Sequence, residues 1–467
     1  MFYISLYIQE ARNNLMKKET YDKPDPQLTD PEHLTKILNS SVEIPMRTFD
    51  DLRSKITLLD HPCGFGKTTS LLSVINSQPD LKFLVVVNTL DEVDRIMLGV
   101  SQGRMFAPKD ALEANANKGE QLEALLVANK SVVITHKLYE KAGRLADGGL
   151  LQDYSVIIDE VPNTIRALQT VKPESMKEIY LDKGFLEMSR TAELRVTQKW
   201  IDEYDKFSDT LRSSIFNASR GRGLFYDGKG NLITSIPVSL FDYAGSVTVL
   251  TFLSSGSLLT KFLELNGLKY ETKTVPGALR AFRERALSLL TIQAIPALEK
   301  VPYSYSKQTD YTVSSKSART TATALKNLKQ RQLVDIDPGN ILLTCSKSAW
   351  YKSSRRGDID DTRPGPFAKD SRLFSKANWI ANTTRGTNNY SHCTHLIYLY
   401  EQNANPVLMN WMEVNDAEFR QQYAVTEMIQ WIWRSQIRNG LPVTVYMPSK
   451  RMRDLLTSWL RLDLSTH

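Results

Sequence analysis

Apolar residues along this chain gather in short, nearly continuous runs rich in β-branched side chains, separated by longer amphipathic stretches. Such runs suit strands buried on both faces, as in a parallel sheet. In the first half of the chain the predicted strands cover 56–59, 83–87, 132–134, 156–158 and 247–253. A second series covers 341–344, 379–381, 396–399 and 443–447. Because the spacers between runs have helical length and composition, the pattern predicts βαβ units in two α/β lobes with parallel sheets.

Breaks in this rhythm predict where the domains lie. Residues 1–50 are expected to form a helical lead-in, with Asp30 as N-cap and Pro31 in the first turn. The first lobe is expected at 51–278, with a helical and hairpin insertion at about 165–243, and the second lobe at 279–467. The stretch 176–212 has helical periodicity, and glycines at 221–231 indicate a hairpin or loop. Residues 270–283 are interpreted as a linker, and 304–321, rich in serine, threonine and lysine, as a loop.

Composition restricts the class of protein only slightly. The 467 residues are 42% hydrophobic and 24% charged, which is typical of a folded globular chain. Fifty-nine Lys and Arg against 52 Asp and Glu give a net charge of +7, which favours a polyanionic partner without establishing one. The three cysteines lie far apart, so we expect neither a zinc framework nor a disulfide framework. With no apolar run near the ~20 residues that span a bilayer, the protein is expected to be soluble and intracellular, in the cytoplasm or nucleoid.

The strongest chemical signal is a glycine-containing loop between a predicted strand and a predicted helix. Gly64 and Gly66 allow a close backbone approach to phosphate, Lys67 would reach the β- and γ-phosphates, and the Thr68 hydroxyl would bind Mg²⁺. The general phosphate-loop (Walker A) pattern needs glycine at position 61, where His61 stands instead. Because the other positions fit and the loop lies between a strand and a helix, the segment still predicts an ATP site. Its residues are Pro62, Cys63, Gly64, Phe65, Gly66, Lys67, Thr68 and Thr69.

A pair of carboxylates ends the predicted strand at 156–158. At the carboxyl edge of a parallel sheet, Asp159 and Glu160 would face the crevice where ligands bind. Asp159 is expected to hold Mg²⁺, and Glu160 to polarise the water that attacks the γ-phosphate. An ordinary solvated strand end is the alternative interpretation, which the preceding phosphate loop makes less attractive.

These segments together resemble the motifs of superfamily 2 (DEAD-like) helicases. The loop matches that family's form of the phosphate loop at Pro62, Gly64, Gly66, Lys67 and Thr68, and residues 159–162 match its Asp-Glu box. Two segments in the first half resemble motifs that contact the nucleic acid backbone in the family: Asn88 with Thr89, and Thr135 with His136. Residues 249–254 are similar to the Ser/Thr-Ala-Thr motif, although Phe252 replaces the alanine. This resemblance gives Thr251 and Ser254 a role in coupling ATP state to strand grip.

The second half carries weaker matches. Residues 383–388 resemble motif V, which implies strand contacts for Thr384, Arg385 and Thr387 and coupling roles for Gly386 and Asn388. Gln430, Arg434 and Arg438 resemble motif VI, but Trp433 replaces its glycine and the second arginine falls one position late. One of the two arginines should be the arginine finger, and the spacing leaves open which one. The alternative is an amphipathic helix with packed tryptophans and its arginines in solvent.

The resemblance implies two RecA-like lobes with the ATP cleft between them. It implies an ATP hydrolase, using ATP and Mg²⁺, that translocates on or unwinds nucleic acid; single-stranded or tailed DNA is favoured over RNA, because no RNA-binding appendage is visible. The modest length leaves room for a partner protein that directs the motor. A P-loop kinase or small-molecule phosphotransferase is the main alternative, and a non-hydrolysing nucleic-acid-binding module is another. The stretch His392, Cys393 and His395 is interpreted as core or loop rather than as a metal cluster.

Overall fold

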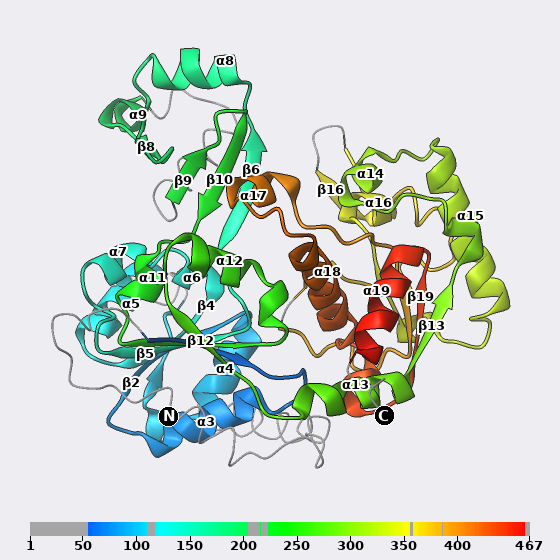
Figure 1. The fold of residues 1–467 in the computed structure, drawn as a ribbon, viewed down its shortest axis with the longest axis horizontal. Helices are drawn as coiled ribbons and strands as arrows, with labels where there is room; N and C mark the ends of the chain where they lie inside the picture. Colours follow the sequence, from blue (N-terminus) through cyan, green and yellow to red (C-terminus); the bar gives the residue numbers. More distant parts are fainter. Residues whose placement is uncertain are drawn as a thin grey trace, which may run out of the picture.

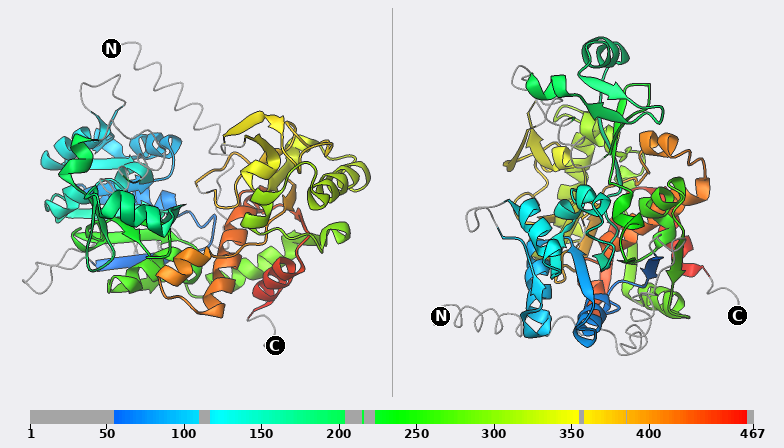
Figure 2. Two further views of the ribbon diagram at one scale, coloured as in Figure 1. Left: turned by 90° about the horizontal axis from the view of Figure 1, so that it is seen from above. Right: turned by 90° about the vertical axis from the view of Figure 1, so that its left-hand side faces the viewer.

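The computed structural model describes residues 55–109, 117–203, 215, 223–354, 358–384 and 386–462. The expectations for the lead-in at 1–50 and for Arg385 lie outside these residues. Two parallel sheets flanked by helices form two lobes that lie side by side (Figures 1 and 2). The predicted α/β fold class, with two parallel-sheet lobes, is therefore confirmed.

The first sheet has seven strands in the order β12-β1-β11-β5-β2-β4-β3, all paired in parallel. The four strands predicted earliest in the chain are β1 (Lys55–Asp60), β2 (Lys82–Val87), β4 (Ser131–Thr135) and β5 (Tyr154–Asp159). The others are β3 (Met105–Phe106), β11 (Ser246–Thr251) and β12 (Tyr270–Lys273). The central strand β5 is buried at every position, because helices cover both faces of the sheet.

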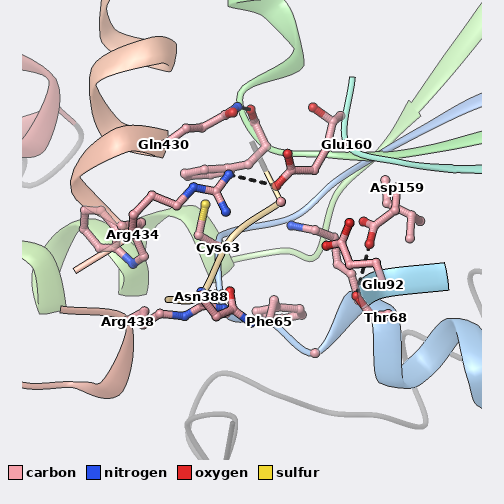
Figure 3. Close-up of a pocket in the computed structure, with 18 of the residues that line it drawn as sticks. Cys63, Phe65, Thr68, Glu92, Asp159, Glu160, Asn388, Gln430, Arg434 and Arg438 are labelled. Carbon is pink, nitrogen blue, oxygen red and sulfur yellow. Dashed lines mark hydrogen bonds and ion pairs between the residues drawn. The ribbon is translucent and has the colours of Figure 1, made fainter. Parts of the chain in front are cut away.

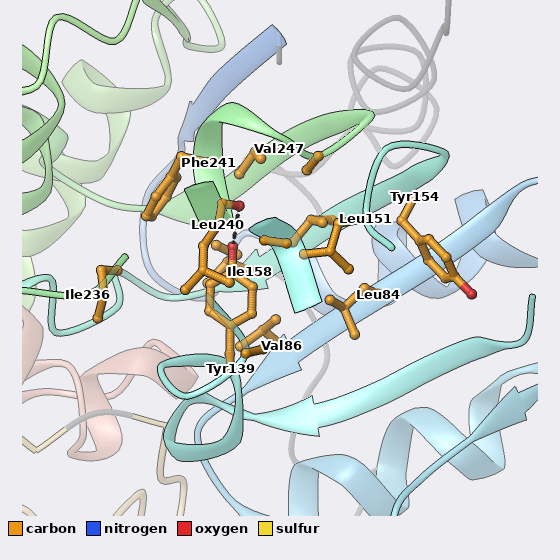
Figure 4. Packing of buried hydrophobic residues seen from close by; sticks show 14 of the residues in the cluster. Leu84, Val86, Tyr139, Leu151, Tyr154, Ile158, Ile236, Leu240, Phe241 and Val247 are labelled. Atoms are coloured by element: carbon orange, nitrogen blue, oxygen red, sulfur yellow. Dashed lines mark hydrogen bonds between the residues drawn. The ribbon is translucent and has the colours of Figure 1, made fainter. Parts of the chain in front are cut away.

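Two groups of helices cover the first sheet. On one face, α3 (Lys67–Ser77) and α4 (Leu90–Gly99) pack their apolar side chains against the strands. On the other face lie α5 (Lys118–Val127), α6 (His136–Tyr139), α7 (Gly143–Asp147), α11 (Ser239–Asp242) and α12 (Leu258–Leu265). Figure 4 shows this second layer, in which the buried Tyr139 hydroxyl donates to the Leu240 carbonyl oxygen at 2.8 Å. The sheet edge that carries the phosphate loop is thus fixed by packing on both sides.

The second sheet has five parallel strands in the order β13-β19-β18-β14-β17. They are β13 (Leu290–Ala294), β14 (Ile341–Thr344), β17 (Asn378–Trp379), β18 (His395–Tyr398) and β19 (Val443–Met447). One face packs on α13 (Ala278–Leu289), α18 (Ala417–Ile432) and α19 (Lys450–Arg461). The other packs on α15 (Lys316–Arg331) and on the region of α16 (Lys347–Trp350). A short hairpin, β15 (Tyr351–Ser353) with β16 (Ile359–Pro364), and α14 (Tyr305–Asp310) complete this lobe.

An insertion between β5 and β11 projects from the first lobe (Figure 1). It contains an antiparallel sheet of β6 (Ile165–Thr170), β10 (Asn231–Ser235) and β9 (Gly223–Tyr226). Strands β9 and β10 form a hairpin, one of the two alternatives, hairpin or loop, that the glycines left open. Beyond it lie α8 (Pro173–Ser175), a π-helix (Met176–Leu181), β7 (Leu186–Met188) paired with β8 (Leu194–Val196), and α9 (Gln198–Asp202). The insertion contacts α17 (Pro406–Trp411) of the second lobe, where the Phe225 and Trp411 rings lie 5.5 Å apart.

Several expectations about local structure were wrong. Residues 304–321 hold α14 and the start of α15 instead of a loop, because Ala318, Ala322 and Leu325 bury one helical face that the surrounding polar residues mask. The linker expected at 270–283 contains β12 and the start of α13. The helical periodicity at 176–212 yields only the π-helix and α9 among the described residues, with a β-hairpin between them. Strand β11 ends at Thr251, before Leu253 turns into the left-handed region at a φ of 58°.

Helix α18 lies between the two lobes (Figure 1). Although it belongs by sequence to the second lobe, the Thr426 hydroxyl donates to the Leu253 carbonyl oxygen at 3.3 Å. Gly256 of the first lobe approaches so closely that a Cβ there would lie 2.3 Å from the Thr426 hydroxyl oxygen. The first turn of α18 also contacts the first lobe, since the Lys261 ammonium lies 5.3 Å from the centre of the Phe419 ring. Helix α18 is therefore held against the first lobe at several points along its length. No helix in the described part of the chain is long and apolar enough to cross a membrane.

Candidate nucleotide site between the lobes

The glycine-containing loop joins β1 directly to the first turn of α3. Gly64 and Gly66 have φ angles of 79° and 74°, in the left-handed region that favours glycine, and Gly66 is the N-cap of α3. The Lys67 ammonium donates to the carbonyl oxygens of His61, at 2.7 Å, and Pro62, at 3.2 Å. The loop thus brings a helix N-terminus and a lysine to one spot, which is the arrangement that binds phosphate.

The other loop residues divide between the pocket and the lobe contact. Phe65 is buried and packs on Ala278 and Val275, where the chain enters the second lobe. The Cys63 thiol also faces the pocket, and burial raises its pKa. Thr69 is exposed at the pocket wall. Pro62 is the one member of the predicted set that does not line the pocket among the described residues, and it serves through its carbonyl oxygen.

The carboxylate pair meets this loop at the carboxyl edge of the sheet. The Thr68 hydroxyl donates to a carboxylate oxygen of Asp159 at 3.3 Å (Figure 3). Burial, together with the neighbouring Glu160, raises the pKa of Asp159 to about 6. Hydroxyl and carboxylate oxygens are ligands that Mg²⁺ prefers, and a cation at this point would compensate a buried carboxylate. Thr68 and Asp159 therefore fit a Mg²⁺ ion by their chemistry.

Glu160 is held by both lobes. Its Oε1 accepts from the Arg434 guanidinium at 2.9 Å, and its Oε2 accepts from the Asn88 amide at 3.1 Å. The Arg434 side chain is only 10% exposed, so the arginine expected in solvent under the amphipathic-helix interpretation is buried in the cleft. Trp431 and Trp433 are buried, as that interpretation expected.

The other two residues that resemble motif VI, Gln430 and Arg438, also lie at the cleft. The Gln430 amide donates to the Phe252 carbonyl oxygen at 3.0 Å. Arg438 lines the pocket beside Asn388, to whose side-chain oxygen it donates. Residues from both halves of the chain thus surround one pocket, with loop 63–69 and Asp159 on one side and Arg434 with Arg438 on the other (Figure 3).

The segments expected to contact nucleic acid lie close behind the carboxylates. Thr89 caps α4 by accepting from the Glu92 backbone N–H at 3.3 Å, and His136 is buried with its Nε2 2.9 Å from the Asp159 carbonyl oxygen. Thr135 ends β4 and is half-buried. On the second lobe, Thr384 and Thr387 are also half-buried, and the Thr387 carbonyl oxygen accepts from Arg434 at 3.4 Å.

Two of the four residues with expected coupling roles, Thr251 and Ser254, lie at or just after the end of β11. Thr251 lines the pocket, and the Ser254 hydroxyl donates to the Asp60 carboxylate at 2.7 Å. Asp60 also accepts the backbone N–H groups of Leu253 and Ser254, at 2.7 and 2.8 Å. It thereby stabilises the left-handed turn that follows β11, a role that the sequence pattern did not indicate.

Sequence reasoning missed two charged residues of the pocket wall, Glu92 and Arg95. The Glu92 carboxylate accepts the backbone N–H groups of Asn88, at 3.0 Å, and Thr89, at 3.2 Å, and completes a capping box with Thr89. Burial, together with Asp159 and Glu160, raises the pKa of Glu92 to about 7. The spacing of Thr89 and Glu92 is the sequence signature of such a box, so this signal could have been found.

The discounted histidine and cysteine stretch has ordinary structural contacts. The His392 Nε2 lies 3.1 Å from the Gly339 carbonyl oxygen, Cys393 is buried, and the His395 ring stacks on Tyr446.

Comparison with known proteins places this geometry in a class of fold. The solved structure XPD_APO has a TM-score of 0.51 over 93% of this chain and 98% of that chain, at 14% identity. This likeness concerns the fold, and it supports the expected architecture of two RecA-like lobes with a cleft between them. A structure of RecG bound to a three-way DNA junction gives a TM-score of 0.38, at 10% identity over 97% of this chain and 47% of that chain.

Sequence comparison points to a particular relative. A family model described as the YonV C-terminal Rossmann-like domain matches residues 286–460, within the second lobe. The SPbeta prophage-derived uncharacterized protein YonV of Bacillus subtilis (strain 168) is 25% identical over 431 residues, which cover 87% of this chain and 98% of that protein. The likeness extends over both lobes and does not by itself supply an activity.

Proposed function

We propose that this chain is an ATP hydrolase of the superfamily 2 type, built from lobes at 51–278 and 279–467, that couples hydrolysis to movement on a nucleic acid strand. The observation that carries the proposal is the contact between Glu160 of the first lobe and Arg434 of the second lobe. A carboxylate at the end of β5 meets an arginine that follows α18, and both lie beside the phosphate loop. A single-lobe phosphotransferase needs no such cross-lobe arginine, so this contact favours the motor over the kinase alternative.

In this proposal, loop 62–69 holds the triphosphate of ATP, and Lys67 turns from the His61 and Pro62 carbonyls to the β- and γ-phosphates. Thr68 and Asp159 hold Mg²⁺, which supplies positive charge to the phosphates. Glu160 accepts a proton from the attacking water as the bond to the γ-phosphorus forms and ADP leaves.

Arg434 is the arginine finger in this proposal, because it is buried directly beside Glu160, whereas Arg438 pairs with Asn388 at the rim. The finger stabilises negative charge that develops on the transferred phosphoryl group. Because it comes from the second lobe, hydrolysis requires the two lobes to close on the nucleotide.

The strand is proposed to lie across both lobes, contacted by Asn88, Thr89, Thr135 and His136 of the first lobe and by Thr384, Arg385 and Thr387 of the second. Contacts of this kind go mainly to phosphates, so little sequence preference is expected. DNA is proposed ahead of RNA, following the sequence-based expectation.

ATP turnover measured against a panel of single- and double-stranded DNA and RNA tests the function. We expect stimulation by a single-stranded form, and Lys67→Ala should abolish turnover. Strand displacement from substrates with 3′ or 5′ tails then separates unwinding from translocation alone. A purified enzyme that no nucleic acid stimulates, or that transfers phosphate to a small molecule instead of water, would refute the motor.

A further inference from the structure

Asn88 occupies an unusual position for a residue expected only to contact a strand. It directly follows β2, the strand next to β5 in the sheet, so its side chain lies beside the carboxylates at the end of β5. The Asn88 amide nitrogen donates to Oε2 of Glu160 at 3.1 Å. The residue thus reaches from the segment expected to bind the strand to the group expected to activate water.

The backbone around Asn88 is fixed from the first lobe. The Glu92 carboxylate accepts the Asn88 N–H at 3.0 Å and the Thr89 N–H at 3.2 Å, so both residues are tied to the first turn of α4. A shift of this turn would therefore move the Asn88 amide relative to Glu160.

The second lobe also packs against Asn88 through Gly386. Gly386 has a φ of 61°, and a Cβ built there would lie 2.7 Å from the Asn88 Cβ and 3.1 Å from the Glu92 carboxylate. Gly386 lies in the segment 383–388, the one segment of the second lobe that is expected to contact the strand. Two of the three segments expected to contact the strand therefore meet at Asn88: residues 88–89 contain it, and Gly386 of segment 383–388 packs against it.

Two hydrogen bonds hold the Glu160 carboxylate in one orientation. With Arg434 on Oε1 and Asn88 on Oε2, the Glu160 carboxylate accepts a hydrogen bond at each oxygen, and these two bonds fix the direction in which it points. Glu160 also has a φ of 66°, so its backbone is held in the left-handed region. Releasing one contact would let the carboxylate turn toward a water molecule at the γ-phosphate.

We propose that Asn88 is a positioning residue that restrains Glu160 until nucleic acid binds, so that strand contact at residues 88–89 and 384–388 releases the carboxylate for hydrolysis. This inference rests on the proposed function and adds to it the path by which the strand controls chemistry. In the released state, Glu160 takes the proton of the attacking water, the new P–O bond forms, and the bond from the γ-phosphorus to ADP breaks.

The test compares ATP turnover with and without single-stranded DNA for two substitutions. Asn88→Ala removes the amide, and Asn88→Leu keeps its approximate size against Gly386 but cannot donate to Glu160. A hydrogen bond to a charged group is strong enough to change a rate about tenfold. We therefore expect both variants to raise basal kcat about tenfold, to leave the KM for ATP unchanged, and to lose most of the stimulation by DNA.

Asn76→Ala serves as the matched control, because the Asn76 amide donates to the Gly99 carbonyl oxygen at 3.0 Å, at the far end of α3. It should keep the wild-type stimulation. Thermal unfolding and binding of a fluorescent ATP analogue establish that each variant is folded and binds nucleotide.

The outcomes separate the two proposals. If wild type is stimulated by DNA and both Asn88 variants keep its basal rate and stimulation, the restraint by Asn88 is refuted while the motor stands. A fall in basal kcat with stimulation preserved would also refute it, since Asn88 would then assist Glu160 instead of restraining it. Wild-type protein without ATP turnover would refute the proposed function, and this inference with it.

Discussion

Replacing Arg434 by alanine separates the proposed arginine finger from an ordinary structural arginine. The Arg434 side chain is 10% exposed and Glu160 is 26% exposed, so the charges meet where water screens them only partly. Arginine fingers contribute roughly 10³ to 10⁵ in kcat. Because solvent still reaches Glu160, we take the lower limit, a loss of about 10³ in kcat, which corresponds to about 4 kcal/mol of transition-state stabilisation. Affinity for ATP should change by no more than about threefold, because the phosphate loop supplies most of the binding.

Single-turnover hydrolysis at saturating ATP and saturating DNA measures this loss, and equilibrium binding of a fluorescent ATP analogue measures the affinity. Arg438→Ala, which removes the contact with Asn388, should lower kcat by only about tenfold. Arg280→Ala provides the control, since Arg280 forms an exposed ion pair with Glu284 on α13 and should leave kcat unchanged. The assignment is refuted if Arg438→Ala costs more than Arg434→Ala, or if Arg434→Ala stays within tenfold of wild type.

Three further predictions concern the lobe contacts and the buried carboxyls. Gly386→Ala should lower DNA-stimulated kcat at least tenfold in steady-state assays. Gly386 has a φ of 61°, and the added Cβ would lie 2.7 Å from the Asn88 Cβ. A variant that turns over ATP at the wild-type rate would contradict this prediction. Glu92 has a pKa raised to about 7, so its ionisation between about pH 5 and pH 8 costs the folded state stability as pH rises. The Tm of Glu92→Gln minus the Tm of wild type should therefore increase as the pH rises from about 5.5 to about 8.5. A Tm difference that does not change with pH would contradict this prediction. A double-mutant cycle of Phe225→Ala and Trp411→Ala in urea unfolding should give a coupling of about 1 kcal/mol, and additive losses would show that the rings do not interact.

The sequence predicted the parts of the fold that depend on local apolar pattern. Strands such as β2 and β5 consist almost wholly of buried apolar residues, so their position could be read from composition alone. Helix α15 was missed because its buried face uses small residues such as Ala318 and Ala322 within a polar stretch. Edge strand β12, Tyr270–Lys273, was missed because it is mostly exposed and gains its place by pairing with β1.

The candidate site also contains parts that the local sequence predicts and parts that it does not. The spacing of Gly64, Gly66 and Lys67 describes a local turn, so the sequence alone indicates a phosphate loop. The choice between Arg434 and Arg438 depends on how the second lobe meets the first, and no local pattern encodes that meeting. The contact between Asn88 and Glu160 was missed for the same reason, since the two residues follow neighbouring strands that are far apart in the chain.

The location of α18 affects how this protein can be divided. A cut near residue 279 would follow the order of the chain, yet it would strip the first lobe of the helix that covers Gly256 and Leu253. A separately expressed second half would present the Thr426 face of α18 to water, and its Gln430 amide would lose the Phe252 carbonyl. Each half is therefore expected to be less soluble alone than together, and mixing the two polypeptides should restore the contacts of α18 with the first lobe.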